Sequence, residues 1–60
     1  MFTRHKIYYT IESKDDDRFV FLCSYSSYNE TEVRLNELKL QSPTTEYRVL
    51  KIEKDIEEIE

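Results

Sequence analysis

Residues 18–25, RFVFLCSY, decide the fold because they form the one run of the chain that is apolar at both odd and even positions. Read at the two-residue period of a strand, the side chains divide between two faces, Phe19, Phe21, Cys23 and Tyr25 against Val20 and Leu22. Such a strand is expected in the centre of its sheet. If the last strand pairs with the first instead, residues 18–25 become an exposed edge and an aggregation hazard.

The segment before this run has the pattern of a strand with one apolar face. In HKIYYTIES, residues 5–13, Ile7, Tyr9 and Ile11 alternate with Tyr8, Thr10 and Glu12, and β-branched and aromatic residues dominate. The polar residues 13–17, SKDDD, then turn the chain into a hairpin. Because the chain has no glycine, an aspartate is expected to take any left-handed backbone conformation in that turn.

A helix is predicted to follow the hairpin. Asn29 fits the N-cap, and Glu32 stands where its side chain can reach back to the cap amide. Tyr28 and Val33 occupy the positions of a hydrophobic staple. The helix should run to about Leu40, before Pro43, and pack on the sheet through a stripe at helical spacing, which consists of Thr31, Leu35 and Leu38.

A third strand is predicted for residues 45–52, TEYRVLKI, with Tyr47 and Val49 on one face and Leu50 and Ile52 on the other. Residues 53–60 form an acidic, amphipathic extension that fits either a short helix or a continuation of the strand. The predicted fold is therefore α+β, a ββαβ domain over residues 1–52 with one helix on a three-stranded antiparallel sheet.

Association is the expected source of stability for so short a chain. Sixty residues bury a small core, and the single cysteine excludes an internal disulfide. We predict a two-fold symmetric homodimer that either joins sheet edges or stacks helix-free faces. Its expected interface consists of apolar residues with no helix to cover them, namely Val20, Leu22, Leu50 and Ile52.

No constellation of residues predicts catalysis or a bound cofactor. His5 is the one histidine, and Cys23 lies among apolar residues, where a buried and inert thiol is expected. An oxyanion hole or phosphate loop usually needs glycine, which the chain lacks. The aspartates of residues 15–17 do not have the spacing of a calcium loop, and a zinc site would need more ligands. We expect no enzyme, no cofactor and no metal.

The charge pattern bears on partners. Residues 1–52 hold eight basic and eight acidic residues, so the extension carries the whole net charge of −4. Five tyrosines could stack on bases, but a neutral body offers no basic groove for phosphates. The extension could keep the chain soluble, imitate phosphates, or dock into a basic groove of another protein. Its expected partner-binding residues are Glu53, Asp55, Ile56, Glu57, Glu58 and Ile59.

No apolar run approaches the ~20 residues of a membrane span, and no signal peptide is evident, so a cytoplasmic location is expected. In layout and composition the chain, with its ending YRVLKIEKDIEEIE, resembles accessory proteins of phages that infect low-GC Gram-positive bacteria. That resemblance implies a small dimeric inhibitor of a host enzyme or defence complex. Proteins of this kind include those directed at systems such as Hachiman and the uracil-DNA glycosylase inhibitors. The alternatives are a nucleic-acid-associated regulator and a structural subunit of a larger assembly.

Overall fold

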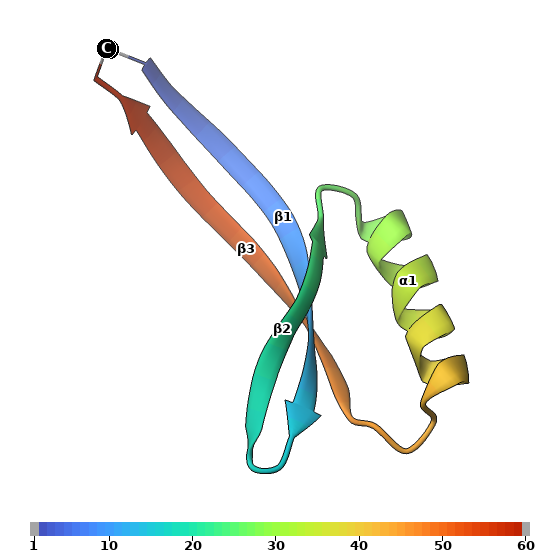
Figure 1. The fold of residues 1–60 in the computed structure, drawn as a ribbon. Coiled ribbons are helices and arrows are strands. Elements are labelled where there is room, and N and C mark those ends of the chain that lie inside the picture. The colour runs from blue at the N-terminus through green and yellow to red at the C-terminus, as the bar shows by residue number, and fades with distance from the viewer. Residues whose placement is uncertain (1, 60) are drawn as a thin grey trace.

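The computed structural model describes residues 2–59, with the side chains of Phe2 and Glu58 left out of the description. It contains β1 (Phe2–Asp15), β2 (Arg18–Tyr25), α1 (Tyr28–Gln41) and β3 (Tyr47–Glu58) in that order (Figure 1). The three strands form one antiparallel sheet, and α1 lies between β2 and β3 in sequence. The predicted ββαβ order and α+β class are confirmed.

The strand order β2-β1-β3 makes β1 the central strand. The expectation that residues 18–25 form the central strand is therefore wrong. The alternative, in which the last strand pairs with the first and β2 becomes an edge, is confirmed. The physical reason is length, since the 14 residues of β1 pair with β3 from Phe2 to Ser13 and with β2 from Tyr9 to Asp15. The two apolar sides of β2 consequently lie beside a free edge rather than inside the sheet.

The sheet register defines two faces, because directly paired residues point to the same side. One face, here called the helix face, is covered by α1. Two contacts show this cover: the rings of Tyr9 and Tyr28 lie edge to face at 5.4 Å, and the Tyr47 hydroxyl donates a hydrogen bond to the Leu38 carbonyl at 3.3 Å. The helix face carries Tyr9, Ile11, Cys23, Tyr25, Tyr47 and Val49. The opposite face, here called the open face, has no helix over it (Figure 1).

A β-bulge in β2 changes which residues share a face. Ile11 pairs with Cys23 and Glu12 with Phe21, so Leu22 is the extra residue. Before the bulge, Phe19 and Phe21 therefore lie on the open face, whereas Cys23 after it lies on the helix face. The expectation that these residues share one side is wrong. Val20 is also misassigned, because it pairs with Ser13 on the helix face.

The hairpin turn has the chemistry that the sequence predicts. Asp16 takes a φ of 58°, the one positive φ among the non-glycine residues that the structure describes. Aspartate tolerates the left-handed region better than most residues with a β-carbon, because its short side chain bonds the local backbone. In this turn an aspartate therefore takes the positive φ that glycine takes in many other turns.

Helix α1 begins earlier than predicted. Its N-cap is Ser27, with extended backbone angles and no capping bond from its side chain, so Asn29 and Tyr28 lie inside the helix. The predicted capping box and hydrophobic staple are therefore wrong. Instead, the Ser27 carbonyl accepts bonds from both the amide and the hydroxyl of Thr31, at 3.1 and 2.8 Å. No helix in the described part of the chain is long and apolar enough to cross a membrane.

The core is small. Among the described residues, Ile11 is the apolar side chain with 0% exposure, and Thr31 at 0% and Thr10 at 6% are the buried polar ones. The Cα radius of gyration is 14.4 Å, against about 10 Å expected for a compact chain of this length. The molecule measures 47 × 26 × 14 Å, so it is long and thin rather than globular.

The length comes from a two-stranded arm. Residues 2–8 of β1 pair with residues 52–58 of β3, beyond the point where β2 ends and away from α1 (Figure 1). We call this ribbon the arm. Of the two conformations predicted for the acidic extension, the strand is the one observed as far as Glu58. Strand pairing with β1 supplies the hydrogen bonds that an eight-residue helix could not sustain alone.

Candidate interaction surfaces

The open face carries an apolar patch that no helix of the described residues covers. Phe21 is 63% exposed and Leu22 is 42% exposed. Three half-buried side chains from the two longer strands continue the patch, namely Tyr8, Leu50 and Ile52. We call these five residues the open-face patch. Apolar side chains grouped on one face of a soluble chain are typical of a contact surface for another molecule.

An ion pair lies beside the patch. The Arg48 guanidinium donates a hydrogen bond to the Glu12 carboxylate at 2.6 Å, and the Glu12 side chain is only 18% exposed. The same guanidinium lies over the Phe19 ring, 4.0 Å from its centroid. Both charges are thus already partnered, so this part of the open face could be covered without leaving an isolated charge.

The arm continues the open face with positive charge. Arg4, Lys6 and Lys54 share this side of the ribbon, as the register of β1 and β3 requires. Lys6 and Lys54 are direct cross-strand partners, and their ammonium groups lie 5.3 and 5.6 Å from the centroid of the Tyr8 ring. Tyr8 is therefore the member of the open-face patch that both cations approach through its ring.

The other side of the arm is acidic. Glu53, Asp55 and Glu57 alternate along β3 on this side. His5 lies among them, with its Nδ1 2.9 Å from Asp55 Oδ1 and its Nε2 3.7 Å from Glu53 Oε2. Lys51 Nζ lies 2.9 Å from Glu53 Oε1. The two sides of the arm are therefore opposite in charge, because successive side chains of a strand point to opposite sides.

Titration of the Glu53 carboxylate tests its contact with Lys51. A hydrogen bond from Lys51 is the main cause that holds the pKa of Glu53 below its ordinary value of 4.5. Lys51→Gln should raise the Glu53 pKa toward that value, as followed by side-chain NMR titration. Because the folded-state pKa is lowered, the stability from this pair is present above about pH 4.5 and is lost as the pH falls through the folded-state pKa. An unchanged Glu53 pKa in the variant would contradict the contact.

The structure divides the residues predicted to bind a partner. Glu53, Asp55 and Glu57 face one side of the arm, and Ile56 is half-buried on the other. Ile59 follows the end of β3 and is 78% exposed. The Glu58 side chain lies outside the described residues. An apolar anchor ringed by these acids therefore does not form on one side of the ribbon, and any role of these residues in binding stays a prediction.

Three of the four residues predicted for a dimer interface lie together. Leu22, Leu50 and Ile52 belong to the open-face patch, whereas Val20 lies on the helix face. Phe21 and Tyr8 are the members of the patch that the sequence did not assign to this interface, and Phe21 is the more exposed of the two. A strict two-residue alternation assigns Phe21 to the wrong face, and only the bulge at Leu22 moves it. Whether these residues meet a second copy stays a prediction.

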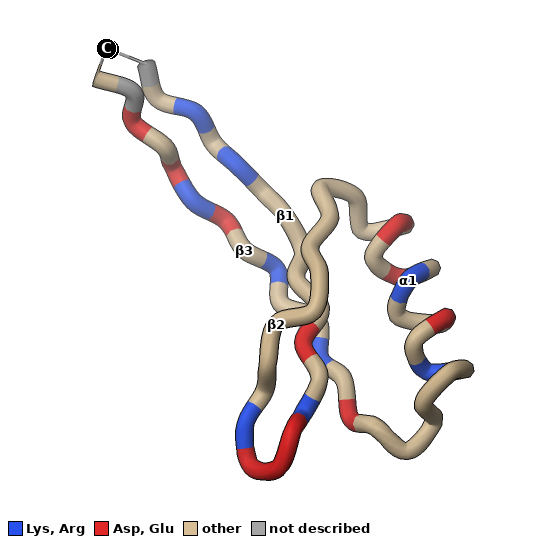
Figure 2. Tube along the Cα trace, in the orientation of Figure 1, with Lys and Arg blue, Asp and Glu red and all other residues tan. Residues whose placement is uncertain are grey.

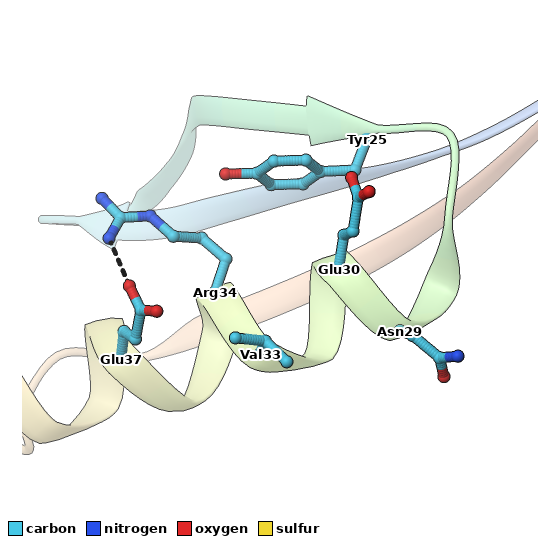
Figure 3. A pocket seen from close by; sticks show the side chains of 6 residues that line it. All are labelled: Tyr25, Asn29, Glu30, Val33, Arg34 and Glu37. Atoms are coloured by element: carbon cyan, nitrogen blue, oxygen red, sulfur yellow. Dashed lines mark hydrogen bonds and ion pairs between the residues drawn. The ribbon is translucent and has the colours of Figure 1, made fainter.

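An open groove runs between β2 and α1 (Figure 3). The ring of Tyr25 lies in the space between β2 and α1, and Glu30 and Arg34 extend from the helix toward β2. Arg34 is bonded to Glu37 at 3.1 Å, which raises the pKa of the Arg34 guanidinium. The Cys23 thiol is the main cause that raises the pKa of the Tyr25 phenol above its ordinary value. The groove has one exposed apolar side chain, Val33, and of its charged groups Arg34 and Glu37 are paired with each other.

The candidate catalytic and metal-ligating residues stay apart. Cys23 is a half-buried free thiol that pairs with Ile11, six residues along β1 from His5 and therefore about 20 Å away. Asp15, Asp16 and Asp17 are all exposed at the hairpin tip. Within residues 2–59 no group of three histidine, cysteine, aspartate or glutamate side chains has the geometry to hold a metal ion.

Comparisons with known proteins returned no matching family model, no matching curated protein and no matching solved structure. What the chain does must therefore follow from its own surfaces.

Proposed function

We propose that this protein is a non-enzymatic protein-binding module that works as a homodimer in the cytoplasm. The observation that carries the proposal is the imbalance between core and surface. Ile11 is fully buried, whereas Phe21 and Leu22 lie open to solvent on a sheet face that no helix covers. A chain with so small a core and with exposed apolar side chains gains stability by association, which is how small domains without disulfides or metals are usually completed.

The surface area supports the same proposal. The chain exposes 4915 Å², whereas a compact monomer of its mass would expose about 4,200 Å². The excess of about 700 Å² is close to the ~800 Å² that each partner buries in an interface of standard size. One protein–protein contact would therefore bring this chain to the surface area that is normal for a protein of its mass.

The proposed role is that of an inhibitor, encoded by a phage and directed at a bacterial enzyme or defence system. The acidic side of the arm supports it, because Glu53, Asp55 and Glu57 lie on a ribbon that projects beyond the rest of the fold (Figure 2). A projecting acidic ribbon is complementary to a basic cleft, such as one that binds nucleic-acid phosphates. The resemblance in layout to phage accessory proteins supports the proposed phage origin.

A nucleic-acid-associated regulator is the second candidate, favoured by one observation. The basic side of the arm brings Lys6 and Lys54 to the ring of Tyr8, which is the pairing of cation and aromatic group that single strands bind. Salt dependence separates the two candidates, because phosphate binding weakens steeply with ionic strength and an apolar protein contact does not.

Affinity capture from bacterial lysate tests the proposed function. The bait is the full chain, because β3 runs unbroken through residue 52 and truncation there would remove half a strand. Asp55→Lys with Glu57→Lys reverses two charges on the acidic side of the arm. The matched control, Glu30→Lys with Glu32→Lys, makes the same change of net charge on exposed positions of α1.

The proposal predicts one protein in stoichiometric amount, retained after nuclease treatment, captured by the wild type and the control and lost with the arm variant. Equal capture by all three chains would show that the acidic side of the arm does not bind the partner. Nucleic acid retained at low salt, with no protein, would instead establish the regulator.

A further inference from the structure

We infer that a second copy of this chain pairs along the free edge of β2, strand β2 against strand β2, so that the two sheets continue into one. This arrangement rests on the proposed homodimer and specifies its contact. Three features of β2 carry it: backbone groups that point away from the sheet, an edge without charged side chains, and an exposed aromatic ring beside that edge.

The backbone register shows which groups of β2 point outward. The Lys14 amide donates a hydrogen bond to the Glu46 carbonyl at 2.8 Å, so the even-numbered residues of β1 bond toward β3 and the odd-numbered ones toward β2. Val20 pairs with an odd-numbered residue and therefore bonds to β1. The amides and carbonyls of its neighbours, Phe19 and Phe21, consequently point away from the sheet. Within residues 2–59, no bond outside the strand pairing involves them.

The free edge of β2 lacks the charged side chains that usually keep strands from joining. No residue from 19 to 25 is charged, and Figure 2 shows the strand in tan beyond its start. The other edge of the sheet differs, because β3 carries charged residues along its length, including Lys51, Glu53 and Asp55. Strand β2 is therefore the edge at which a copy can pair without bringing like charges together.

A second copy fits this edge when the two-fold axis passes through Val20. Antiparallel pairing about that point places Phe19 of each chain opposite Phe21 of the other, and these are the residues with outward backbone groups. Each such pair exchanges two hydrogen bonds. Arg18 then lies opposite the uncharged Leu22 of the second copy, so no like charges meet where the strands join.

This pairing also covers the exposed ring of the strand. Phe21 is 63% exposed, whereas Phe19 is half-buried beneath the Arg48 guanidinium. Both rings lie on the open face, so each Phe21 gains Phe19 of the second copy as a direct neighbour, with β-carbons about 5 Å apart. Because paired residues point to the same side, the two open-face patches then lie side by side on one sheet.

The bulge at Leu22 limits the length of the contact. It interrupts the backbone pattern of β2, so the regular outward groups are those of Phe19 and Phe21 before it. The bulge and the charged edge of β3 together oppose the addition of further strands, which closes the assembly at two chains. Stacking of two open faces is the competing arrangement. It would cover Phe21 too, but it would leave the outward amides of β2 without a bond to the second copy.

Amide hydrogen exchange on the unmodified chain, followed by NMR alongside sedimentation velocity, tests the pairing. In the dimer the amides of Phe19 and Phe21 should exchange at least about tenfold more slowly than those of Lys51 and Glu53, after correction for intrinsic rates. Lys51 and Glu53 are the matched control, because their amides point outward from the free edge of β3. The difference should grow with protein concentration, since only the dimer closes the edge of β2.

A dimer in which all four amides exchange alike would overturn the edge pairing and leave the homodimer standing, with stacked faces as its arrangement. Slow exchange at Lys51 and Glu53 instead of at Phe19 and Phe21 would overturn it too and move the contact to β3. A single-chain mass at every concentration would overturn both the pairing and the homodimer.

Discussion

Ile11→Ala should lower the free energy of unfolding by about 2–5 kcal/mol, the usual cost of removing a large buried aliphatic side chain. Ile11 is completely buried under α1, between β2 and β3, and no second apolar side chain in the described structure is buried to the same degree. A domain of this length has a total stability of only about 3–9 kcal/mol. Urea denaturation followed by circular dichroism should therefore show a transition midpoint at a much lower urea concentration than that of the wild type.

The matched control is Ile7→Ala, the same truncation on the same strand and face at a residue that is 38% exposed. It should cost much less, because less apolar area leaves water and no closed cavity forms. Both variants should be compared with the wild type at one protein concentration, since association adds to apparent stability. Equal losses at the two positions would contradict a core centred on Ile11.

Phe21→Asp should convert the proposed dimer into a monomer. Phe21 is the most exposed member of the open-face patch, at 63%, so in the free chain its replacement removes little internal packing. In the proposed dimer the same position would be desolvated if the open-face patch forms the contact, and symmetry would bury two unpaired carboxylates. Light scattering should report the mass of one chain, while circular dichroism should show an unchanged fold.

Val33→Asp is the matched control for that experiment. Val33 is 60% exposed but lies on α1, in the groove rather than on the open face. It should leave the mass in solution unchanged. Loss of the dimer with Val33→Asp and not with Phe21→Asp would move the interface from the open face to the groove between β2 and α1.

The sequence predicts the elements and their order because those depend on local patterns. The alternation of Ile7, Tyr9 and Ile11 marks a strand, the spacing of Thr31, Leu35 and Leu38 marks a helix, and both patterns have the faces that the structure shows. The assignment of a left-handed residue to the aspartate turn also follows from local chemistry, and Asp16 confirms it.

The sequence leaves the strand order open between two alternatives. The apolar content of β2 suggests a central strand, but position in the sheet depends on which pairings the whole chain can make. The long β1 pairs with both other strands and so occupies the centre. The apolar residues of β2 therefore suggest the wrong position in the sheet. Because β2 is an edge strand, its uncovered apolar side chains indicate a contact surface for another molecule.

The bulge and the helix start were missed for physical reasons too. One extra residue at Leu22 moves Phe19 and Phe21 to the open face, and nothing in RFVFLCSY marks it. Asn29 and Glu32 have the spacing of a capping box, yet the N-cap of α1 is Ser27, two residues earlier, and Tyr28 packs on Tyr9. Tertiary contact here outweighs a local capping preference of about 1 kcal/mol.

The candidate surfaces divide in the same manner. Leu22, Leu50 and Ile52 could be recognised as uncovered from their alternation, and the structure brings them together on the open face. The opposite charges on the two sides of the arm could not be read from a segment that also fitted a helix. They follow only once residues 53–58 are known to pair as a strand with β1.

The most direct test of the account is the mass of the unmodified chain in solution, measured by sedimentation equilibrium over a range of micromolar concentrations. The proposed homodimer predicts a mass of twice the 7.4 kDa of one chain across that range. The mass of a single chain at every concentration would contradict it, and would leave the open-face patch of a stable monomer without the partner proposed for it.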